Sequence, residues 1–274
     1  MTDFQTGWRR PDEDLDYIRK GGLVFTPSRA FGAPEEFDTR SIIAVENQGQ
    51  TSSCVGHATS SLMEACAWLA ARSAGDVAPE QFSRWYAYLQ AQKQSGFFGS
   101  DQGATISGAA KGMKDKGCCF ERTLPFPGRY VKTIPREADV EADKFKIRSH
   151  ANMTGHADVF GFMAGNFGGV EIGISWTSRL ANSNGVIELA DVKGNGGGHA
   201  LLLFGWSKRV DSQGRHYVWL HNSHGKSWGN GGRAEVAPDV IDWWGSSRNN
   251  EMIGFSDLTG FDTPRIVPSI DDVM

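Results

Sequence analysis

The sequence has few cysteines and no long apolar run. Four cysteines among 274 residues are too few for the disulfide framework of a small secreted scaffold. No apolar stretch approaches the roughly 18 residues that a membrane span requires. The first ten residues lack the hydrophobic core of a secretory signal peptide. We therefore expect neither a membrane segment nor a signal peptide, and we expect a cytoplasmic location.

The sequence also lacks a strong charge of either sign. It contains 28 basic and 32 acidic residues, for a net charge of −4. No basic patch or stripe indicates a nucleic-acid partner. The adjacent Cys118 and Cys119 have no CxxC spacing and no histidine at metal-ligand spacing. They are predicted to be small buried residues, with a redox pair or metal ligands as the alternatives. Cys66 falls on an apolar helix face and is predicted to lie in the core. We expect no metal and no cofactor.

Helical patterns come first in the chain and strand patterns follow, which favours an α+β protein. The length allows a large core in one domain or in two lobes. No internal repeat is visible. The pattern predicts helices at about 53–72, 79–92, 105–116 and 157–167, and strands at 42–45, 169–175, 199–206, 215–221, 231–236 and 251–255.

One stretch organises the rest of the chain. Residues 48–58 form a polar, glycine-containing loop that ends at Cys54, and an apolar helical pattern begins there. Ser52 and Ser53 are the candidate N-caps. Unpaired backbone N–H groups and the helix dipole of a first turn favour the thiolate and lower the pKa of a thiol. Cys54 is therefore either a reactive thiol or a buried structural cysteine at a helix start.

Two further stretches favour the reactive thiol. His199 follows three glycines and begins an apolar strand, and Asn222 follows the next predicted strand. A cysteine, a histidine and an asparagine are thus far apart in sequence, each at the end of a regular element. A nucleophilic site in which the third residue orients the base needs this set of side chains. Taken singly, His199 is also typical of a core histidine and Asn222 of a turn residue.

These motifs resemble those of the papain-like cysteine peptidases. Gln48 lies six residues before Cys54 (54 − 48), as the oxyanion-hole glutamine of that family does. His199 follows Cys54 by 145 residues (199 − 54). Asn222 heads the motif Asn-Ser-x-Gly-x-x-Trp-Gly, which is the asparagine motif of the family. The detailed resemblance covers residues 37–125 and 196–235. The opening Gly-Trp … Pro-Asp … Asp-Tyr of residues 7–17 resembles that of some bacterial and phage members.

The resemblance implies a cysteine endopeptidase, a thiol hydrolase that cuts peptide bonds. Cys54 would be the nucleophile, His199 the base and later the acid, and Asn222 the group that orients the imidazole. Gln48 and the backbone N–H of Cys54 would stabilise the oxyanion. The resemblance further implies substrate-binding roles for three residues: Gly103, Gly198 and Trp228.

The resemblance also implies one two-lobed catalytic domain. Residues 1–37 would form an N-terminal arm along the body of the protein, with a cleavable pro-segment as the alternative. Residues 38–126 would form a helical lobe with the nucleophile helix. Residues 127–274 would form a β-rich lobe with an antiparallel sheet or barrel that carries His199 and Asn222, and the site would lie in the cleft between the lobes.

Several residues depart from the family pattern. Val55 stands in place of the usual aromatic residue after the nucleophile, and His224 in place of a shielding tryptophan. His224 would then raise the polarity near Asn222 or face solvent. His57 is one helical turn beyond Cys54 and is expected to pack or to modulate the cleft. Gln102 stands where a glycine is usual. Thr51 and Ser100 replace the cysteines of the family disulfide, which favours a reducing compartment.

Three functions remain open from the sequence. The first is peptide hydrolysis, with a protein, a peptide or a peptidoglycan peptide as substrate. The second is a papain-like binding or structural component, for instance of a phage particle, with weak, gated or no activity. The third is acyl transfer as in transglutaminases, which usually carry aspartate where this chain has Asn222. A phage-particle location is the corresponding alternative to the cytoplasm.

Overall fold

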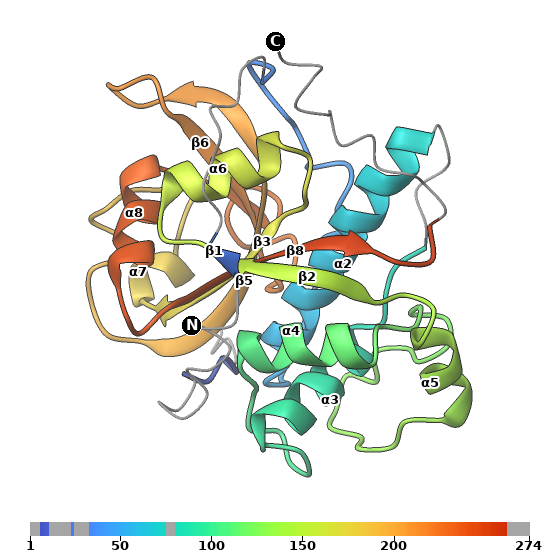
Figure 1. The fold of residues 1–274 in the computed structure, drawn as a ribbon. Helices are drawn as coiled ribbons and strands as arrows, with labels where there is room; N and C mark the ends of the chain where they lie inside the picture. Colours follow the sequence, from blue (N-terminus) through green and yellow to red (C-terminus); the bar gives the residue numbers. More distant parts are fainter. Residues whose placement is uncertain (1–5, 11–22, 25–32, 75–79, 262–274) are drawn as a thin grey trace.

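The computed structural model describes residues 6–10, 23–24, 33–74 and 80–261. The helices α2 (Cys54–Ala74), α3 (Arg84–Ser95) and α4 (Ile106–Asp115) gather on one side of a sheet. The helices α6 (His156–Ala164) and α8 (Pro238–Ser246) lie at the other side (Figure 1). The fold is therefore α+β, as the order of the patterns predicts.

Helix α2 runs between the helical group and the sheet. It packs against α3 on one side and against strands β5 (Gly197–Val210) and β8 (Glu251–Leu258) on the other. Its side chains from Cys54 to Cys66 are almost all buried. Gly56 permits close contact with α3, because a Cβ atom there would lie 2.5 Å from the Cβ atom of Tyr88. The structure thus confirms the helix predicted to begin near Cys54 and the core position of Cys66.

Helix α3 begins later than the sequence pattern predicts. The prediction began at Pro79, which lies outside the described residues, whereas the helix begins at Arg84. Ser83 is its N-cap, and its side chain accepts the N–H of Tyr86. Phe82 lies before the helix and forms an isolated bridge with Phe120. Helix α4 agrees with the prediction, because Thr105 caps its start and Gly117 follows its end with φ of 75°.

The sheet has the strand order β1-β2-β8-β3-β5-β6-β7-β4. Antiparallel pairing joins its central strands, and the terminal pairs β1–β2 and β4–β7 are parallel. Strand β5 pairs with β3 and β6, and its register places His199 opposite Ile174. The remaining strands are β1 (Leu23–Val24), β2 (Ile147–Asn152), β3 (Val170–Trp176), β4 (Val186–Ile187), β6 (His216–His221) and β7 (Arg233–Val236).

Some elements differ from the sequence prediction. Residues 42–45 form a turn and extended chain instead of a strand. The Ile42 N–H donates to Thr39 O at 3.0 Å, and the guanidinium of Arg233 donates to Ile43 O at 2.6 Å. The charged region 132–151, where no sequence pattern predicts an element, contains α5 (Arg136–Ala142) and most of β2. The short helix α7 (Ser178–Ala181) lies where the sequence pattern predicts no element. Most of the predicted N-terminal arm lies outside the described residues.

Candidate active site

Cys54 is the first residue of α2 and is fully buried. Its thiol receives backbone hydrogen bonds from Ala200, which follows His199 on β5, and from Gly7 of the N-terminal segment. Burial nevertheless raises the pKa of the Cys54 thiol to about 12. A thiol at a helix start is predicted to have a lowered pKa, and this prediction is wrong for Cys54. The loss of water around the thiol raises its pKa by more than the nearby N–H donors lower it.

His199 and Asn222 are directly bonded. The distance from His199 Nε2 to Asn222 Oδ1 is 2.8 Å. The backbone N–H of Ser223 also donates to Asn222 Oδ1, at 2.8 Å, so this amide atom is the oxygen. An oxygen can only accept, and Nε2 must therefore carry the hydrogen. The other ring nitrogen, Nδ1, is buried, has no hydrogen-bond partner among the described residues, and keeps its lone pair.

Aromatic rings cover both sides of the His199 imidazole. The Trp176 ring centroid lies 4.6 Å from that of His199, and the His224 ring is stacked on it at 4.4 Å and 21°. His224 is buried, so the alternative that it faces solvent is wrong. Burial lowers the pKa of His199 to about 4, which keeps the imidazole neutral in this arrangement.

Trp228 lies behind these rings. Its ring packs against Trp176, with 5.7 Å between centroids, and its indole N–H donates to Leu180 O. Trp176, which the sequence reasoning missed, is the tryptophan that contacts His199. Its only sequence signal is its position at the end of a strand next to the strand of His199.

Ser223 joins Gln48 to Asn222. Its hydroxyl donates to Gln48 Oε1 at 2.7 Å, and its carbonyl accepts the backbone N–H of Gln48 at 2.9 Å. The side-chain amide of Gln48 donates one hydrogen to Thr51 O at 2.8 Å. The loop of Gln48 is thus fixed to the strand end that carries Asn222. The sequence feature that could have identified Ser223 as part of the site is its place directly after Asn222 in the Asn-Ser motif.

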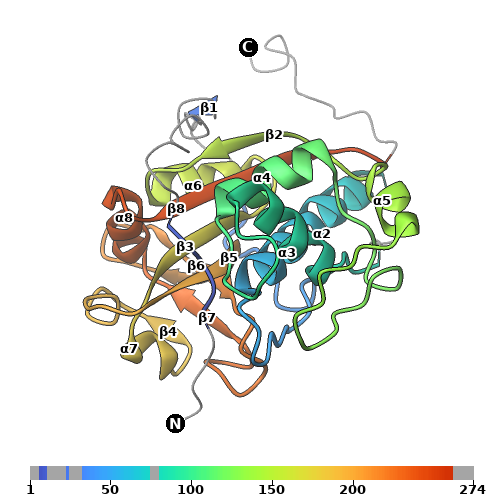
Figure 2. The same ribbon diagram turned by 90° about the horizontal axis from the view of Figure 1, so that it is seen from below.

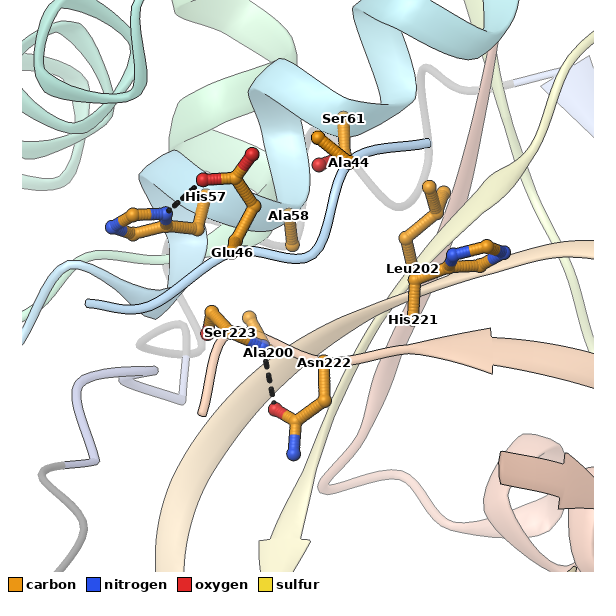
Figure 3. A pocket seen from close by; sticks show the side chains of 10 residues that line it. All are labelled: Ala44, Glu46, His57, Ala58, Ser61, Ala200, Leu202, His221, Asn222 and Ser223. Atoms are coloured by element: carbon orange, nitrogen blue, oxygen red, sulfur yellow. Dashed lines mark hydrogen bonds and ion pairs between the residues drawn. The ribbon is translucent and has the colours of Figure 1, made fainter. Parts of the chain in front are cut away.

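A small polar cavity lies between α2 and the ends of β5 and β6 (Figure 3). Asn222 and Ser223 line one side of it, and His57 and Glu46 lie across from them. His57 Nδ1 lies 3.5 Å from Glu46 Oε2, and the ring packs edge-on against Phe126. His57 is therefore a packing residue of the helical group, one of the two roles expected for it.

The N-terminal segment, residues 6–10, lies between Gly198 on β5 and Ala104 before α4, and its dark-blue trace crosses the sheet near β3 and β5 in Figure 2. The N–H of Trp8 donates to Gly198 O at 3.0 Å. The N–H of Ala104 donates to Gly7 O at 2.9 Å, and the N–H of Arg9 donates to Ala104 O at 2.8 Å. The chain thus hydrogen-bonds to one of its own segments on both walls of the cleft.

Gly103 and Gly198 both lie against this segment. A Cβ atom on Gly103 would lie 1.7 Å from Gly7 O, and one on Gly198 would lie 2.1 Å from Trp8 O. Both glycines are therefore required for the close approach of an extended backbone. They are two of the three residues for which the sequence predicts substrate contacts, and both contact an N-terminal segment of this chain.

The cysteines away from α2 have no ligand-binding arrangement. Cys118 and Cys119 are buried free thiols, as predicted. The described residues contain no group of three or more histidine, cysteine or acidic side chains that would hold a metal ion. None of the described helices has the length and apolar character that crossing a bilayer requires.

Comparison with known proteins identifies the family. The family model described as "Papain family cysteine protease" matches residues 33–249. The chain belongs to the papain family of cysteine proteases. The match spans both the helical group and the strands that carry His199 and Asn222. No curated protein matches the sequence of this papain-family chain.

Solved structures with the same fold include three proteases. Xylellain, a cysteine protease from Xylella fastidiosa, is 18% identical, with 92% of this chain and 95% of that chain covered and a TM-score of 0.71. ProCathepsin B S9 from Trypanosoma congolense is 16% identical, with 92% and 87% covered and a TM-score of 0.66. Digestive procathepsin L 3 from Tenebrio molitor is 18% identical, with 89% and 78% covered and a TM-score of 0.64. At these identities the likeness shows the fold.

Proposed function

We propose that this papain-family protease hydrolyses peptide bonds with Cys54 as nucleophile, His199 as base and acid, and Asn222 as the group that orients the imidazole. The observation that carries the proposal is the hydrogen-bond chain from Ser223 N–H to Asn222 Oδ1 to His199 Nε2. It fixes the tautomer in which Nδ1 is the basic nitrogen.

The reaction follows from that tautomer. His199 Nδ1 accepts the thiol proton of Cys54, and the thiolate attacks the carbonyl carbon of the scissile bond. The tetrahedral oxyanion collapses, the C–N bond breaks, and the amine leaves with the proton from His199. Water then attacks the thioester with His199 as base, and the acid product leaves while the thiol regains its proton. Asn222 orients the imidazole in both its neutral and its charged form.

Gln48 is the proposed oxyanion donor. Its side-chain amide has two hydrogens, and one of them is bonded to Thr51 O. The second is the donor proposed for the oxyanion, together with the backbone N–H of Cys54. Removal of one such donor typically costs about 2.7–4 kcal/mol of transition-state stabilisation. Ser223 holds the Gln48 oxygen, so the amide is oriented before substrate binds.

The N-terminal segment keeps this site in a closed state. Gly7 donates its backbone N–H to the Cys54 thiol, and Trp8 and Arg9 bond to the cleft walls. A substrate backbone needs the same walls, so it must displace residues 6–10. Displacement would also let water reach the thiol and so lower its pKa from the value that burial imposes.

Peptide hydrolysis by matched variants tests the proposal. The segment is loosened by Trp8→Ala in the full chain, and cleavage of a fluorogenic peptide library is followed in that background. We expect Cys54→Ala to abolish cleavage and Cys66→Ala to retain it, because Cys66 is buried away from the site. Equal cleavage by the Cys54→Ala protein would overturn the assignment of the nucleophile.

A further inference from the structure

The loop between α3 and α4 forms one wall of the cleft, and we call its residues 99–104 the wall loop. The N–H of Ala104 donates to Gly7 O at 2.9 Å, and Ala104 O accepts the N–H of Arg9 at 2.8 Å. Apart from the isolated bridge between Ala104 and Trp8, the wall loop contains no helix or strand. Its shape must therefore come from bonds to side chains around it.

The hydroxyl of Tyr88 is the centre of these bonds. Tyr88 belongs to α3 and is fully buried. Its hydroxyl donates to Asp101 Oδ1 at 2.6 Å and accepts the backbone N–H of Gly103 at 3.0 Å. It also accepts the side-chain amide of Gln92 at 3.0 Å. A tyrosine hydroxyl has one hydrogen and two acceptor positions, so its bonding capacity is used in full.

Gln92, one turn further along α3, holds the rest of the wall loop. Its Nε2 donates to Ser100 O at 2.9 Å and to Gly103 O at 3.2 Å. Its Oε1 accepts the hydroxyl of Tyr130 at 2.8 Å, and this hydroxyl accepts the N–H of Gly99 at 3.0 Å. Both ends of the wall loop are thus fixed to buried side chains of α3, one of them through a second tyrosine.

Asp101 extends these bonds to the nucleophile. The backbone N–H of Ser52 lies 3.1 Å from both carboxylate oxygens of Asp101. Ser52 precedes Cys54 by two residues, in the loop that leads into α2. All four cysteines are free thiols, so no disulfide makes this link. One carboxylate therefore connects the loop before Cys54 to α3 and to the wall loop.

We propose that Tyr88 and Asp101 are positioning residues for peptide hydrolysis, because they hold the wall loop in register with Cys54. This inference rests on the proposed peptidase function. None of the bonds that Tyr88 and Asp101 make involves residues 6–10, so the wall loop keeps its shape when a substrate displaces that segment. A wall that is ordered in advance loses less conformational freedom on binding an extended peptide.

A matched pair of variants tests the role of Tyr88. Tyr88→Phe and Tyr86→Phe are made in the full chain with Trp8→Ala, which loosens the segment. Tyr86 belongs to the same helix and is also buried, and its hydroxyl donates to Asp139 Oδ1 at 2.9 Å. Each variant removes one hydroxyl that donates to a carboxylate, and only Tyr88 bonds to the wall loop. Cleavage is measured for peptides with four residues or with one residue before the cleaved bond.

The effect of Tyr88→Phe should depend on substrate length. Ala104 bonds to two positions of the present occupant, Gly7 and Arg9, and a single residue cannot span both. We expect kcat/KM to fall by about tenfold for the longer peptide and by about twofold or less for the shorter one, because Gly103 loses the partner of a buried N–H. Tyr86→Phe should leave the ratio of the two unchanged. An equal loss for both lengths, or the same change of ratio with Tyr86→Phe, would overturn the inference.

Amide hydrogen exchange tests the same contacts without catalysis. In the full chain with Trp8→Ala, we expect Tyr88→Phe to speed exchange of the Gly103 N–H by about tenfold or more, because the amide opens without its acceptor. Asp101→Ala should also speed exchange of the Ser52 N–H, which loses its acceptor directly. Tyr86→Phe is again the control. Unchanged protection of Gly103 in the Tyr88→Phe protein would contradict the positioning role.

The two tests separate the possible failures. Cleavage with a length dependence that Tyr88→Phe leaves intact overturns the positioning role and leaves the peptidase proposal standing. Absence of cleavage in every variant contradicts the peptidase proposal. In that case hydrogen exchange still decides whether Tyr88 and Asp101 fix the wall loop.

Discussion

At the scale of single residues, the site depends on which atom of each polar side chain donates. The Ser223 N–H identifies Asn222 Oδ1 as an acceptor, and Oδ1 in turn places the hydrogen of His199 on Nε2. The Ser223 hydroxyl fixes the Gln48 oxygen at the same time. One serine therefore orients both the residue that holds the base and the proposed oxyanion donor.

Ser223→Ala separates these two effects, because it removes the hydroxyl and keeps the backbone N–H. A hydrogen bond of this kind contributes about 0.5–1.5 kcal/mol, so we expect kcat to fall by about two- to tenfold as Gln48 loses its orientation. KM should change little, since the substrate does not touch the hydroxyl. Peptide turnover measures the effect. Ser149→Ala, on β2, is the control, and an equal loss of kcat there would contradict the explanation.

The pH dependence of stability also belongs to single side chains. Burial, with a smaller contribution from Arg233, lowers the pKa of His221 to about 3. The unfolded chain therefore binds a proton below about pH 6.5 that the folded chain does not accept, so stability falls as pH decreases from about 6.5 to 3. We expect the melting temperature of His221→Gln to fall less over this range than that of the wild type. Parallel pH curves would contradict this assignment.

At the scale of elements, contact between α2 and α3 depends on Gly56. A Cβ atom there would lie 2.4 Å from Arg84 O, a backbone atom that moves only if α3 moves. We expect Gly56→Ala to destabilise the protein by about 1–3 kcal/mol, the usual range for overpacking. Gly112→Ala is the graded control, because its nearest contact is 3.1 Å, to the Gln90 Cβ atom. Urea midpoints measure both, and an equal or larger loss for Gly112→Ala would contradict this packing argument.

The sequence predicted the elements whose pattern is regular. Helix α2, helix α4 and strands β3, β5, β6 and β8 appear where apolar periodicity places them. The boundary of a predicted element differs from that in the structure where a single capping residue sets it, as Ser83 does for the start of α3. Residues 42–45 have the composition of a strand, but no neighbouring strand offers them a ladder of hydrogen bonds.

The candidate site was predictable only in part. The motifs around Cys54, His199 and Asn222 carry a local signal, and the His199–Asn222 hydrogen bond agrees with it. The position of residues 6–10 in the cleft is a long-range contact, with Trp8 and Glu251 separated by 243 positions. No local periodicity encodes such a pair. The raised pKa of Cys54 comes from its burial in the folded chain, so the sequence pattern of a helix start predicted the wrong direction.

At the scale of the whole molecule, the N-terminal segment bridges the two walls of the cleft. Its hydrogen bonds reach Ala104 before α4 and Gly198 on β5, so it joins the helical group to the sheet. The indole of Trp8 adds the bond to Glu251 on β8. The same contacts that close the site should therefore stabilise the fold.

Trp8→Ala should raise activity and lower stability together. Loss of a buried tryptophan removes about 3–5 kcal/mol where the site cannot collapse, so we expect a lower melting temperature. The loosened segment should release the cleft and increase the rate of peptide cleavage. Arg10→Ala, at an exposed neighbour, is the control for the segment. A Trp8→Ala protein with lower stability and unchanged activity would contradict the role of the segment as an occupant of the cleft.

The most direct test of the account is covalent labelling by an epoxide inhibitor of papain-like enzymes, of the E-64 type, read by intact mass. The full chain, its Trp8→Ala variant and the same two proteins with Cys54→Ala are compared. We predict one adduct on the proteins that retain Cys54, formed faster with Trp8→Ala, and none on the Cys54→Ala proteins. An adduct that survives Cys54→Ala, or no adduct even with Trp8→Ala, would contradict the assignment of Cys54 as a nucleophile beneath a displaceable segment.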